Sequence, residues 1–351
     1  MTISRNVILH FKYTRQITPA KDAHSLTLLV AQIVQGPPQR SLMVAPDTLN
    51  SAHQQANAAI DPLAVSRGRT LRMASIRLDP EVGRIHLVTF ADGSTRWRLA
   101  GSRLVRQAKA STWFQSAEIW TLERLLGTIP SFAHDNTKLD FYSTRGLGFW
   151  LWRPYILEYI LSSMPRDSVL LFLDAGCQLN VSAASKQRFS SYIYQARRSG
   201  NLIMRIDQSL DRWCKGDLLA ATGLLQRAAD ICLVEPGVFF LTNNEANMNL
   251  IKEWKHLGST QSNHFIDDSA SHVANAPGFQ EHRHDQAILT CLGETFHLNS
   301  IPQETYYPDA WKSAGRLAPI WAMRNSTPFN LHSSDLLSLA VTALHKRARM
   351  G

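Results

Sequence analysis

Residues 145–180 read RGLGFWLWRPYILEYILSSMPRDSVLLFLDAGCQLN, and this stretch decides the fold class. It predicts an aromatic, glycine-containing loop, a helix over 151–163, and a buried strand over 168–173 that ends at Asp174. In open α/β sheets, ligands bind outside the carboxyl ends of the strands. A carboxylate at that place is suited to hold a metal ion or to face a phosphate, so Asp174 is the first candidate functional residue.

The same alternation of strand and helix extends over the whole chain from residue 85 onward. Strand-like and helix-like segments alternate at the spacing of βα units, which predicts an α/β fold, Rossmann-like, with a mainly parallel sheet flanked by helices. The other predicted strands are 85–90, 118–121, 202–206 and 238–241. The other predicted helices are 98–110, 182–198, one capped by Asn244 that runs to Leu257, and one that opens at His284 and Asp285.

Three regions are predicted along the chain. Residues 1–84 mix short β-like runs with prolines and show no repeat or catalytic motif, so they form an N-terminal extension or subdomain of unknown role. Residues 85–300 form the main domain, and 301–351 a C-terminal helical segment. The end of the chain from Asp335 combines an apolar stripe with a basic tip, which suits either packing on the domain or contact with an anionic membrane surface. Packing is the favoured interpretation.

Composition excludes several classes of protein. The chain has 351 residues, 44% of them hydrophobic, and a formal net charge of +9, which favours anionic partners. Neither a clustered basic stripe nor a nucleic-acid-binding motif accompanies this charge, so nucleic acid is not expected as a partner. Four cysteines without CxxC spacing indicate a reducing compartment and argue against a structural zinc site. Apolar runs shorter than about 18 residues and the lack of a signal-peptide pattern favour a cytoplasmic protein.

Six segments together carry a resemblance to a known family. In this order they resemble the bacterial glycosyltransferase-like proteins of polysaccharide gene clusters, which are similar to the GT-A nucleotide-sugar transferases. The resemblance covers about residues 85–300. The segments are HLVTFADGS (86–94), RGLGFWLWRPYIL (145–157), LLFLDAGCQLN (170–180), RWCKGDLL (212–219), EPGVFFLTNN (235–244) and HRHDQAILT (282–290).

The resemblance implies a GT-A-like fold and a hexosyltransferase of surface polysaccharide or capsule biosynthesis. Such an enzyme moves a sugar from a nucleotide donor, with a UDP-sugar expected, to a glycan or lipid-linked acceptor, and peripheral contact with the inner membrane surface would fit this role. Transfer requires that the leaving diphosphate be neutralised, for which a divalent cation such as Mn²⁺ or Mg²⁺ is expected. The alternative is a non-catalytic nucleotide- or carbohydrate-binding protein on the same fold.

The expected metal site departs from the family pattern. GT-A enzymes commonly carry an Asp-x-Asp triplet, whereas this chain has Asp174, Ala175 and Gly176, so the first acid matches and the second is missing. Asp285 or His284 would then complete the coordination, or cationic side chains would take the place of the metal. The alternative for Asp174 is a strand-end residue that bonds to backbone amides in a turn.

The loop before the helix and the triplet are expected to bind the donor. Arg145 can pair with phosphate oxygens, and Trp152 can stack on a ring, although core packing is the favoured interpretation of the tryptophan. Ala175 and Gly176 would lie against the donor, with Gly176 allowing a close backbone approach. An ordinary turn glycine explains Gly176 equally well.

The RWCKGDLL segment is expected to flank the sugar. There Lys215 would face the diphosphate and Asp217 a sugar hydroxyl. Asp217 could equally cap a helix that begins at Leu218, which needs no ligand. These two interpretations remain open.

Asp285 is the second predicted catalytic acid. It would deprotonate the acceptor hydroxyl, hold the metal or bind the acceptor sugar, and the alternative is a helix N-cap. Glu235, which precedes Pro236, is interpreted as a turn residue. Potential metal ligands are frequent between positions 264 and 284, but their spacing lacks a compact HExxH pattern, which disfavours a zinc hydrolase. They are His264, Asp267, Asp268, His272, His282 and His284.

Overall fold

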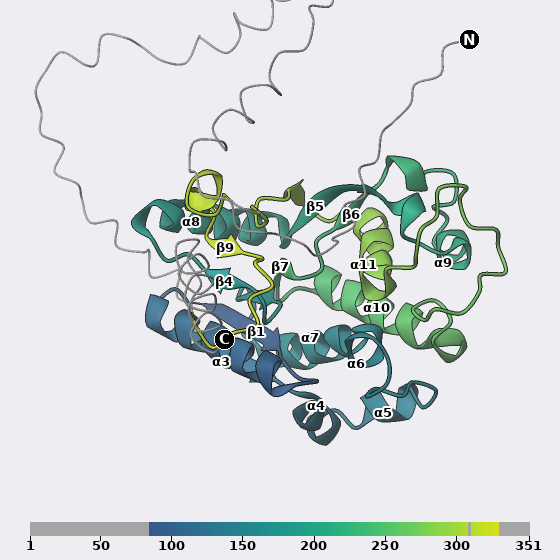
Figure 1. Ribbon diagram of the computed structural model, residues 1–351, viewed down its shortest axis with the longest axis horizontal. Helices are drawn as coiled ribbons and strands as arrows, with labels where there is room; N and C mark the ends of the chain where they lie inside the picture. Colours follow the sequence, from purple (N-terminus) through teal and green to yellow (C-terminus); the bar gives the residue numbers. More distant parts are fainter. Residues whose placement is uncertain (1–83, 308–309, 330–351) are drawn as a thin grey trace, which may run out of the picture. The chain divides into compact units, whose positions relative to one another are not determined.

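A seven-stranded mixed sheet forms the centre of the domain. The computed structural model describes residues 84–307 and 310–329, and Figure 1 shows helices on both faces of the sheet. The strands are ordered β2-β1-β3-β7-β5-β6, with β8 paired to β5. Their bounds are β1 (Ile85–Phe90), β2 (Ser116–Trp120), β3 (Val169–Leu173), β5 (Asn201–Ser209), β6 (Cys232–Val234), β7 (Val238–Thr242) and β8 (Ser300–Pro302).

Most of these strands point in one direction. β1 pairs in parallel with β2 and β3, whereas β7 is antiparallel to both β3 and β5. β5 therefore runs in the direction of β3, and β8 is parallel to β5 while β6 is antiparallel to it. The predicted α/β class with a mainly parallel, helix-flanked sheet is confirmed, with β6 and β7 as the reversed strands.

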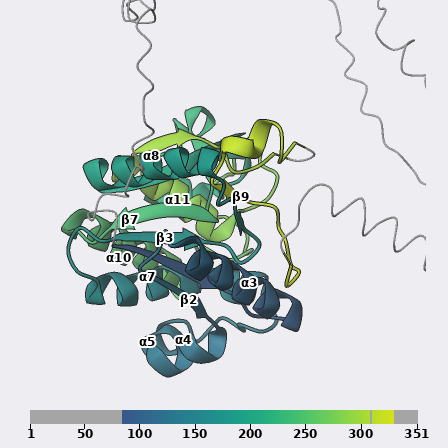
Figure 2. The same ribbon diagram turned by 90° about the vertical axis from the view of Figure 1, so that its left-hand side faces the viewer.

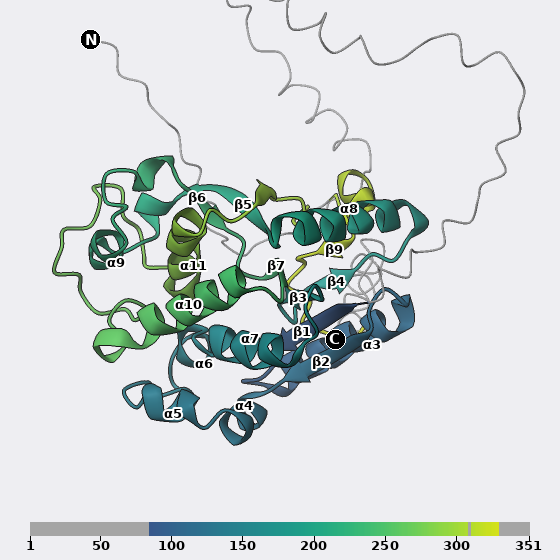
Figure 3. The same cartoon turned by 180° about the vertical axis from the view of Figure 1, so that it is seen from behind.

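Two hydrophobic layers cover the two faces of the sheet. Along β3, Leu170 and Phe172 pack into one layer, and Val169, Leu171 and Leu173 into the other. This alternation follows from the two-residue repeat of a strand, and it explains why β3 is apolar throughout. Figure 3 shows α7 and α8 on opposite sides of the strands.

The helices arise from apolar faces that those layers bury. The layer with Phe172 includes residues of α7, α10 and α11, and the layer with Leu171 includes residues of α3 and α8. Figure 2 looks onto the side of the domain that carries α3 and α8. The helices are α3 (Thr95–Ser111), α4 (Leu122–Thr128), α5 (Ser131–Asp135), α6 (Gly146–Phe149), α7 (Trp152–Ser163), α8 (Ala183–Ser199), α9 (Gly216–Ala221), α10 (Glu245–Asn263, non-helical over 260–262) and α11 (His284–Thr295). In residues 84–307 and 310–329, none of them has the length and apolar character that a membrane crossing demands.

The described residues after 300, which are 301–307 and 310–329, pack on the same domain. β8 pairs with β5, and β9 (Ile320–Trp321) pairs with β4 (Gln178–Leu179) as a separate two-stranded ribbon. In the described part of 301–351, the helical structure is a single 3₁₀ turn over Ala314–Leu317. The predictions for 1–83 and for the amphipathic end from Asp335 lie outside the described residues.

The strand register brings two acidic loops together. Because Val88 lies opposite Phe172 in the parallel β1–β3 pair, the loop that follows β1 runs beside the loop that follows β3. Ala91 and Ala175 pack together there with Ala100 of α3. Two neighbouring carboxyl ends thus define one edge of the sheet, which is where α/β proteins bind ligands.

Gly101 of α3 makes that arrangement possible, and replacing it tests the packing. A Cβ at Gly101 would lie 2.5 Å from the Cβ of Ala91 and 2.6 Å from the Cδ1 of Ile119. Gly101→Ala should therefore lower the free energy of unfolding by about 1–3 kcal/mol, the usual cost of overpacking. Urea denaturation measures the change.

Gly127→Ala is the matched control in α4. A Cβ at Gly127 has no neighbour within 4 Å, so this substitution should be neutral or should stabilise the fold by up to about 1 kcal/mol. Equal stability of the two variants would show that α3 does not pack against the loop after β1 in this way.

Candidate active site

The buried guanidinium of Arg153 lies between the two acids that the sequence singled out. Arg153, in the first turn of α7, is 1% exposed, and its Nη2 lies 3.2 Å from the Oδ1 of Asp174. Its Nη1 forms an ion pair with Asp285, at the start of α11. Asp174 and Asp285 are therefore brought together through one cation. Burial lowers the pKa of Arg153, and the charge of Asp174 opposes that shift.

The two acids differ in their access to solvent. The side chain of Asp174 is 46% exposed, whereas that of Asp285 is 4% exposed. Asp285 is also not the N-cap of its helix, because α11 begins at His284 and Arg283 occupies the capping position. Asp174 begins a turn through its backbone carbonyl, which accepts from the Cys177 amide (2.8 Å), whereas its carboxylate accepts from Arg153. Asp174 is thus accessible to solvent, whereas Asp285 pairs with Arg153 in the protein interior.

Glu235, which the sequence predicted to be a turn residue, adds a third acid beside Asp174. Its carboxylate accepts hydrogen bonds from the Gly237 amide (3.2 Å) and from the Nε2 of Gln303 (2.5 Å). A Cβ at Gly237 would lie 2.6 Å from the Oδ2 of Asp174 and 3.1 Å from the Oε1 of Glu235, so the glycine leaves both carboxylates room against one backbone segment. Burial first, and then the charge of Asp174, raise the pKa of Glu235.

A second buried arginine anchors the loop after β3. Arg103 of α3 donates from Nη2 to the carbonyl oxygens of Ala175 (3.0 Å), Cys177 (2.9 Å) and Asn325 (3.1 Å). It therefore holds the loop from the side opposite Arg153. Burial lowers the pKa of Arg103 to about 10. Nothing in the sequence separates Arg103 from the other basic residues of its helix.

Gly176 allows a close backbone approach, but the backbone that approaches it belongs to residues 324–325 of the protein and not to a ligand. A Cβ there would lie 2.9 Å from the Cα of Arg324, and the amide of Asn325 donates to the Gly176 carbonyl (2.8 Å). The space that the sequence assigned to a donor is thus filled on that side by residues 324–325. The need for glycine at this position is steric.

A cavity of about 290 Å³ opens beside the loop after β1. Within it, the carboxylate of Asp92 accepts from the amides of Gly93 and Leu122 and pairs with Arg98, so it organises the loop. The cavity lies between that loop and the segment before α7. Its lining residues are Asp92, Gly93, Ser94, Thr95, Arg98, Leu122, Tyr142 and Leu147.

The aromatic loop is divided between surface and core. Arg145 is exposed, pairs with Glu281 at 3.6 Å, and has its guanidinium 5.8 Å from the ring centre of Trp150. Trp152 is buried, stacks on Phe90 at 3.9 Å and donates from Nε1 to the Gly146 carbonyl. Core packing, which the sequence favoured for Trp152, is what the structure shows.

Lys215 and Asp217 bind a loop of the protein. Lys215 is buried, and its Nζ donates to the carbonyl of His264 and to the Oδ1 of Asp267 (3.0 Å). Asp217 lies inside α9 rather than at its cap, and its carboxylate accepts from the amides of His272 (2.8 Å) and Val273 (2.7 Å). Both side chains therefore hold the segment that follows α10.

Among the described residues, no group of three or more potential metal ligands contains both His284 and Asp174. The Nδ1 of His284 lies 2.8 Å from the Ile266 carbonyl, its ring stacks on Phe149 at 4.6 Å, and burial lowers its pKa. Within the part of the chain that the structure describes, one group of three or more potential ligands converges, and it is a different one. Its members are Asp217, His264 and His272.

Comparisons with known proteins add little to this geometry. No protein-family model matches the chain, and no curated protein does either. Among the solved structures that match is mouse xyloside xylosyltransferase 1 in its apo form, with 11% sequence identity and a TM-score of 0.38. The match covers 70% of this chain and 99% of that one.

Removing the Arg153 guanidinium tests the ion-pair cluster. Arg153→Met introduces an unbranched apolar side chain in place of the arginine. It leaves the buried Asp285 without the counter-charge of Arg153. We expect the free energy of unfolding to fall by about 3–5 kcal/mol, the usual cost of breaking a buried pair.

Arg227→Met is the control for an exposed pair. Arg227 is 67% exposed and lies 3.6 Å from Glu294, so its replacement should cost about 0–1 kcal/mol in the same denaturation assay. Similar losses in both variants would mean that Arg153 is not held as a buried ion pair.

Proposed function

We propose that this protein is a glycosyltransferase that moves a sugar from a nucleotide-sugar donor to a hydroxyl group of a glycan or lipid-linked acceptor. The observation that carries the proposal is the convergence of Asp174 and Asp285 on Arg153 at the carboxyl end of β3. Ligands of α/β sheets bind at such ends. UDP-sugars as donors and surface polysaccharide as the product are the finer parts of the same proposal.

The donor would lie along the edge formed by the loops after β1 and β3. The cavity beside Asp92 supplies space for it, and the exposed Arg98 lines that cavity. Arg145, which is also exposed, would supply a second cation. The formal net charge of +9 favours the approach of an anionic nucleotide. Trp152 and Lys215, which are buried in other contacts, are left out of the donor site.

A divalent cation fits Asp174 and Glu235 better than Asp174 and His284. Mg²⁺ and Mn²⁺ prefer oxygen ligands, and Mg²⁺ is commonly bound by one or two carboxylates together with substrate phosphates. The carboxylates of Asp174 and Glu235 both lie against Gly237. Together with Asp285, they give the surroundings of Arg153 more carboxylates than this one guanidinium balances. When bound, such an ion would neutralise charge on the leaving diphosphate.

The side chains of the cluster have separate tasks in this proposal. Asp174, the exposed acid, faces the donor, and Arg153 fixes its orientation from below. Asp285 was expected as the base, but its buried carboxylate is bound to Arg153. We therefore assign Asp285 to positioning, since its ion pair holds Arg153 in place.

Donor hydrolysis tests the proposal. Purified full-length protein, incubated with a panel of nucleotide sugars and Mn²⁺ or Mg²⁺, should release nucleoside diphosphate. Asp174→Asn should lower kcat/KM for the best donor by about 10²–10³-fold, as expected when a group that stabilises transition-state charge is removed. Chelation of the metal should lower the rate as well.

Asp207→Asn is the control, because Asp207 is an exposed carboxylate on β5. It should retain the rate of the unmodified chain. Donor binding without turnover would indicate a nucleotide- or carbohydrate-binding protein instead. Failure to bind any donor would contradict the glycosyltransferase assignment.

A further inference from the structure

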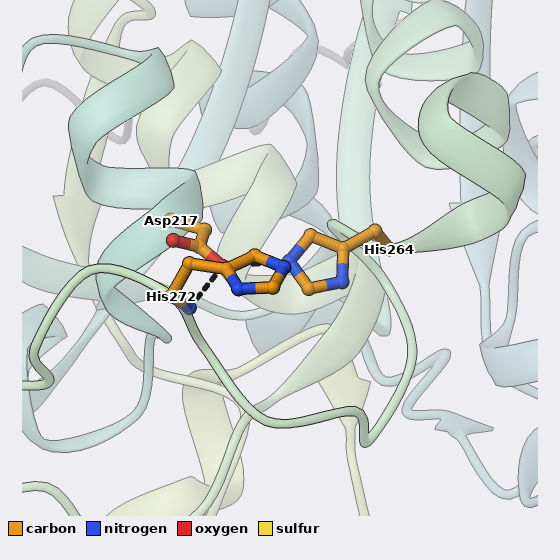
Figure 4. A group of neighbouring side chains, drawn as sticks. All are labelled: Asp217, His264 and His272. Atoms are coloured by element: carbon orange, nitrogen blue, oxygen red, sulfur yellow. Dashed lines mark hydrogen bonds and ion pairs between the residues drawn. The ribbon is translucent and has the colours of Figure 1, made fainter.

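We infer that Asp217, His264 and His272 form a binding site for a transition-metal dication, with Zn²⁺ as the best match. Each residue offers one ligand atom, and the three atoms lie within 4.8 Å of one another. Figure 4 shows the three side chains pointing toward one another. They come from α9, from the C-terminal end of α10 and from the loop that follows.

The chemistry of the donor set favours zinc. Two imidazoles and one carboxylate are ligands that Zn²⁺ binds at about 2.0–2.2 Å, commonly with water in the fourth position. The Nε2 of His264 now lies 2.6 Å from the Oδ2 of Asp217. A metal ion would replace the bridging proton. Tetrahedral geometry would then require the distance between these two atoms to increase by less than about 1 Å. His272 is exposed, so solvent can reach the open position.

Contacts around Asp217 and His264 already orient these two side chains as metal ligands are oriented. Backbone amides of His272 and Val273 hold the Asp217 carboxylate, and the Nδ1 of His264 lies 2.8 Å from the Oγ of Ser269. Such outer contacts on the second ring nitrogen are typical of metal-binding histidines. The nearby charge of Lys215 is balanced, because its Nζ lies 3.0 Å from Asp267.

This site is separate in residues and in chemistry from the carboxylates of the active site. Nitrogen ligands select zinc, whereas the oxygen ligands at Asp174 suit Mg²⁺. The scarcity of paired cysteines argued against structural zinc, but a His and Asp set requires no thiol. The sequence showed His264 and His272 only as part of a long histidine-rich stretch without recognisable spacing, and it assigned Asp217 to a sugar hydroxyl or a helix cap.

Metal binding here would stiffen the segment that leads to Asp285. The Lys215 amide donates to the Nδ1 of His282 (3.3 Å), and the rings of His282 and His284 bond to the carbonyls of Phe265 and Ile266. Hydrogen bonds thus join Lys215, which precedes α9, and the segment that follows α10 to the start of α11. A metal ion that joins α9 to the end of α10 would hold these elements together.

The test is zinc binding to the full-length chain after treatment with a chelator. Isothermal titration with ZnCl₂, in the presence of excess Mg²⁺ to occupy oxygen sites, should show one site lost on His272→Ala. We expect at least about tenfold weaker binding in this variant, and Zn²⁺ should raise the melting temperature of the unmodified chain but not of the variant. Bound Co²⁺ should give the visible absorption of a tetrahedral site.

Two further variants make the result decisive. His134→Ala, at an exposed histidine outside the cluster, should bind Zn²⁺ like the unmodified chain. His264→Ala should lose binding in the same way as His272→Ala, and an unchanged metal-free melting temperature of His272→Ala would show that its fold is intact. Absence of saturable zinc binding, or equal binding in both cluster variants and the unmodified chain, would overturn the site.

Discussion

The ion pair between Arg153 and Asp285 is the interaction on which the active-site edge depends. A guanidinium that is almost fully removed from water is costly unless carboxylates compensate it at close range. Arg153 meets this requirement with one acid from the end of β3 and one from the start of α11. It thereby couples α7, the central sheet and α11, and it determines which acid faces outward.

The sheet supplies the second constraint. Parallel pairing of β1 with β3 places the loops that carry Asp92 and Asp174 side by side, and the antiparallel β7 is preceded by the turn with Glu235. The loops are then held by buried polar contacts, with Arg103 on one side and Arg153 on the other. The acids are therefore positioned by rigid elements, as a binding site requires.

Much of this arrangement could be predicted from the sequence. Apolar runs predicted β1, β3 and β7 to within one residue at each end, and Asn244 does cap α10. The short strands β6 and β8 were missed, because three residues carry too little periodicity. Asp174 and Asp285 were identified by their places at a strand end and a helix start.

The rest could not be predicted because it depends on which distant residues meet. The sequence does not show that the sheet places Glu235 near Asp174. Nor does it show that Lys215, interpreted as a phosphate ligand, pairs with Asp267. The pattern around Trp152 is the same whether the ring faces a ligand or the core.

The most direct test of the central claim is a crystal structure of the full-length protein with a UDP-sugar and Mn²⁺. We predict the diphosphate at the edge formed by the loops after β1 and β3, near Asp174, with Arg153 bound to both Asp174 and Asp285. A nucleotide bound elsewhere, or an Arg153 that contacts neither acid, would contradict the account.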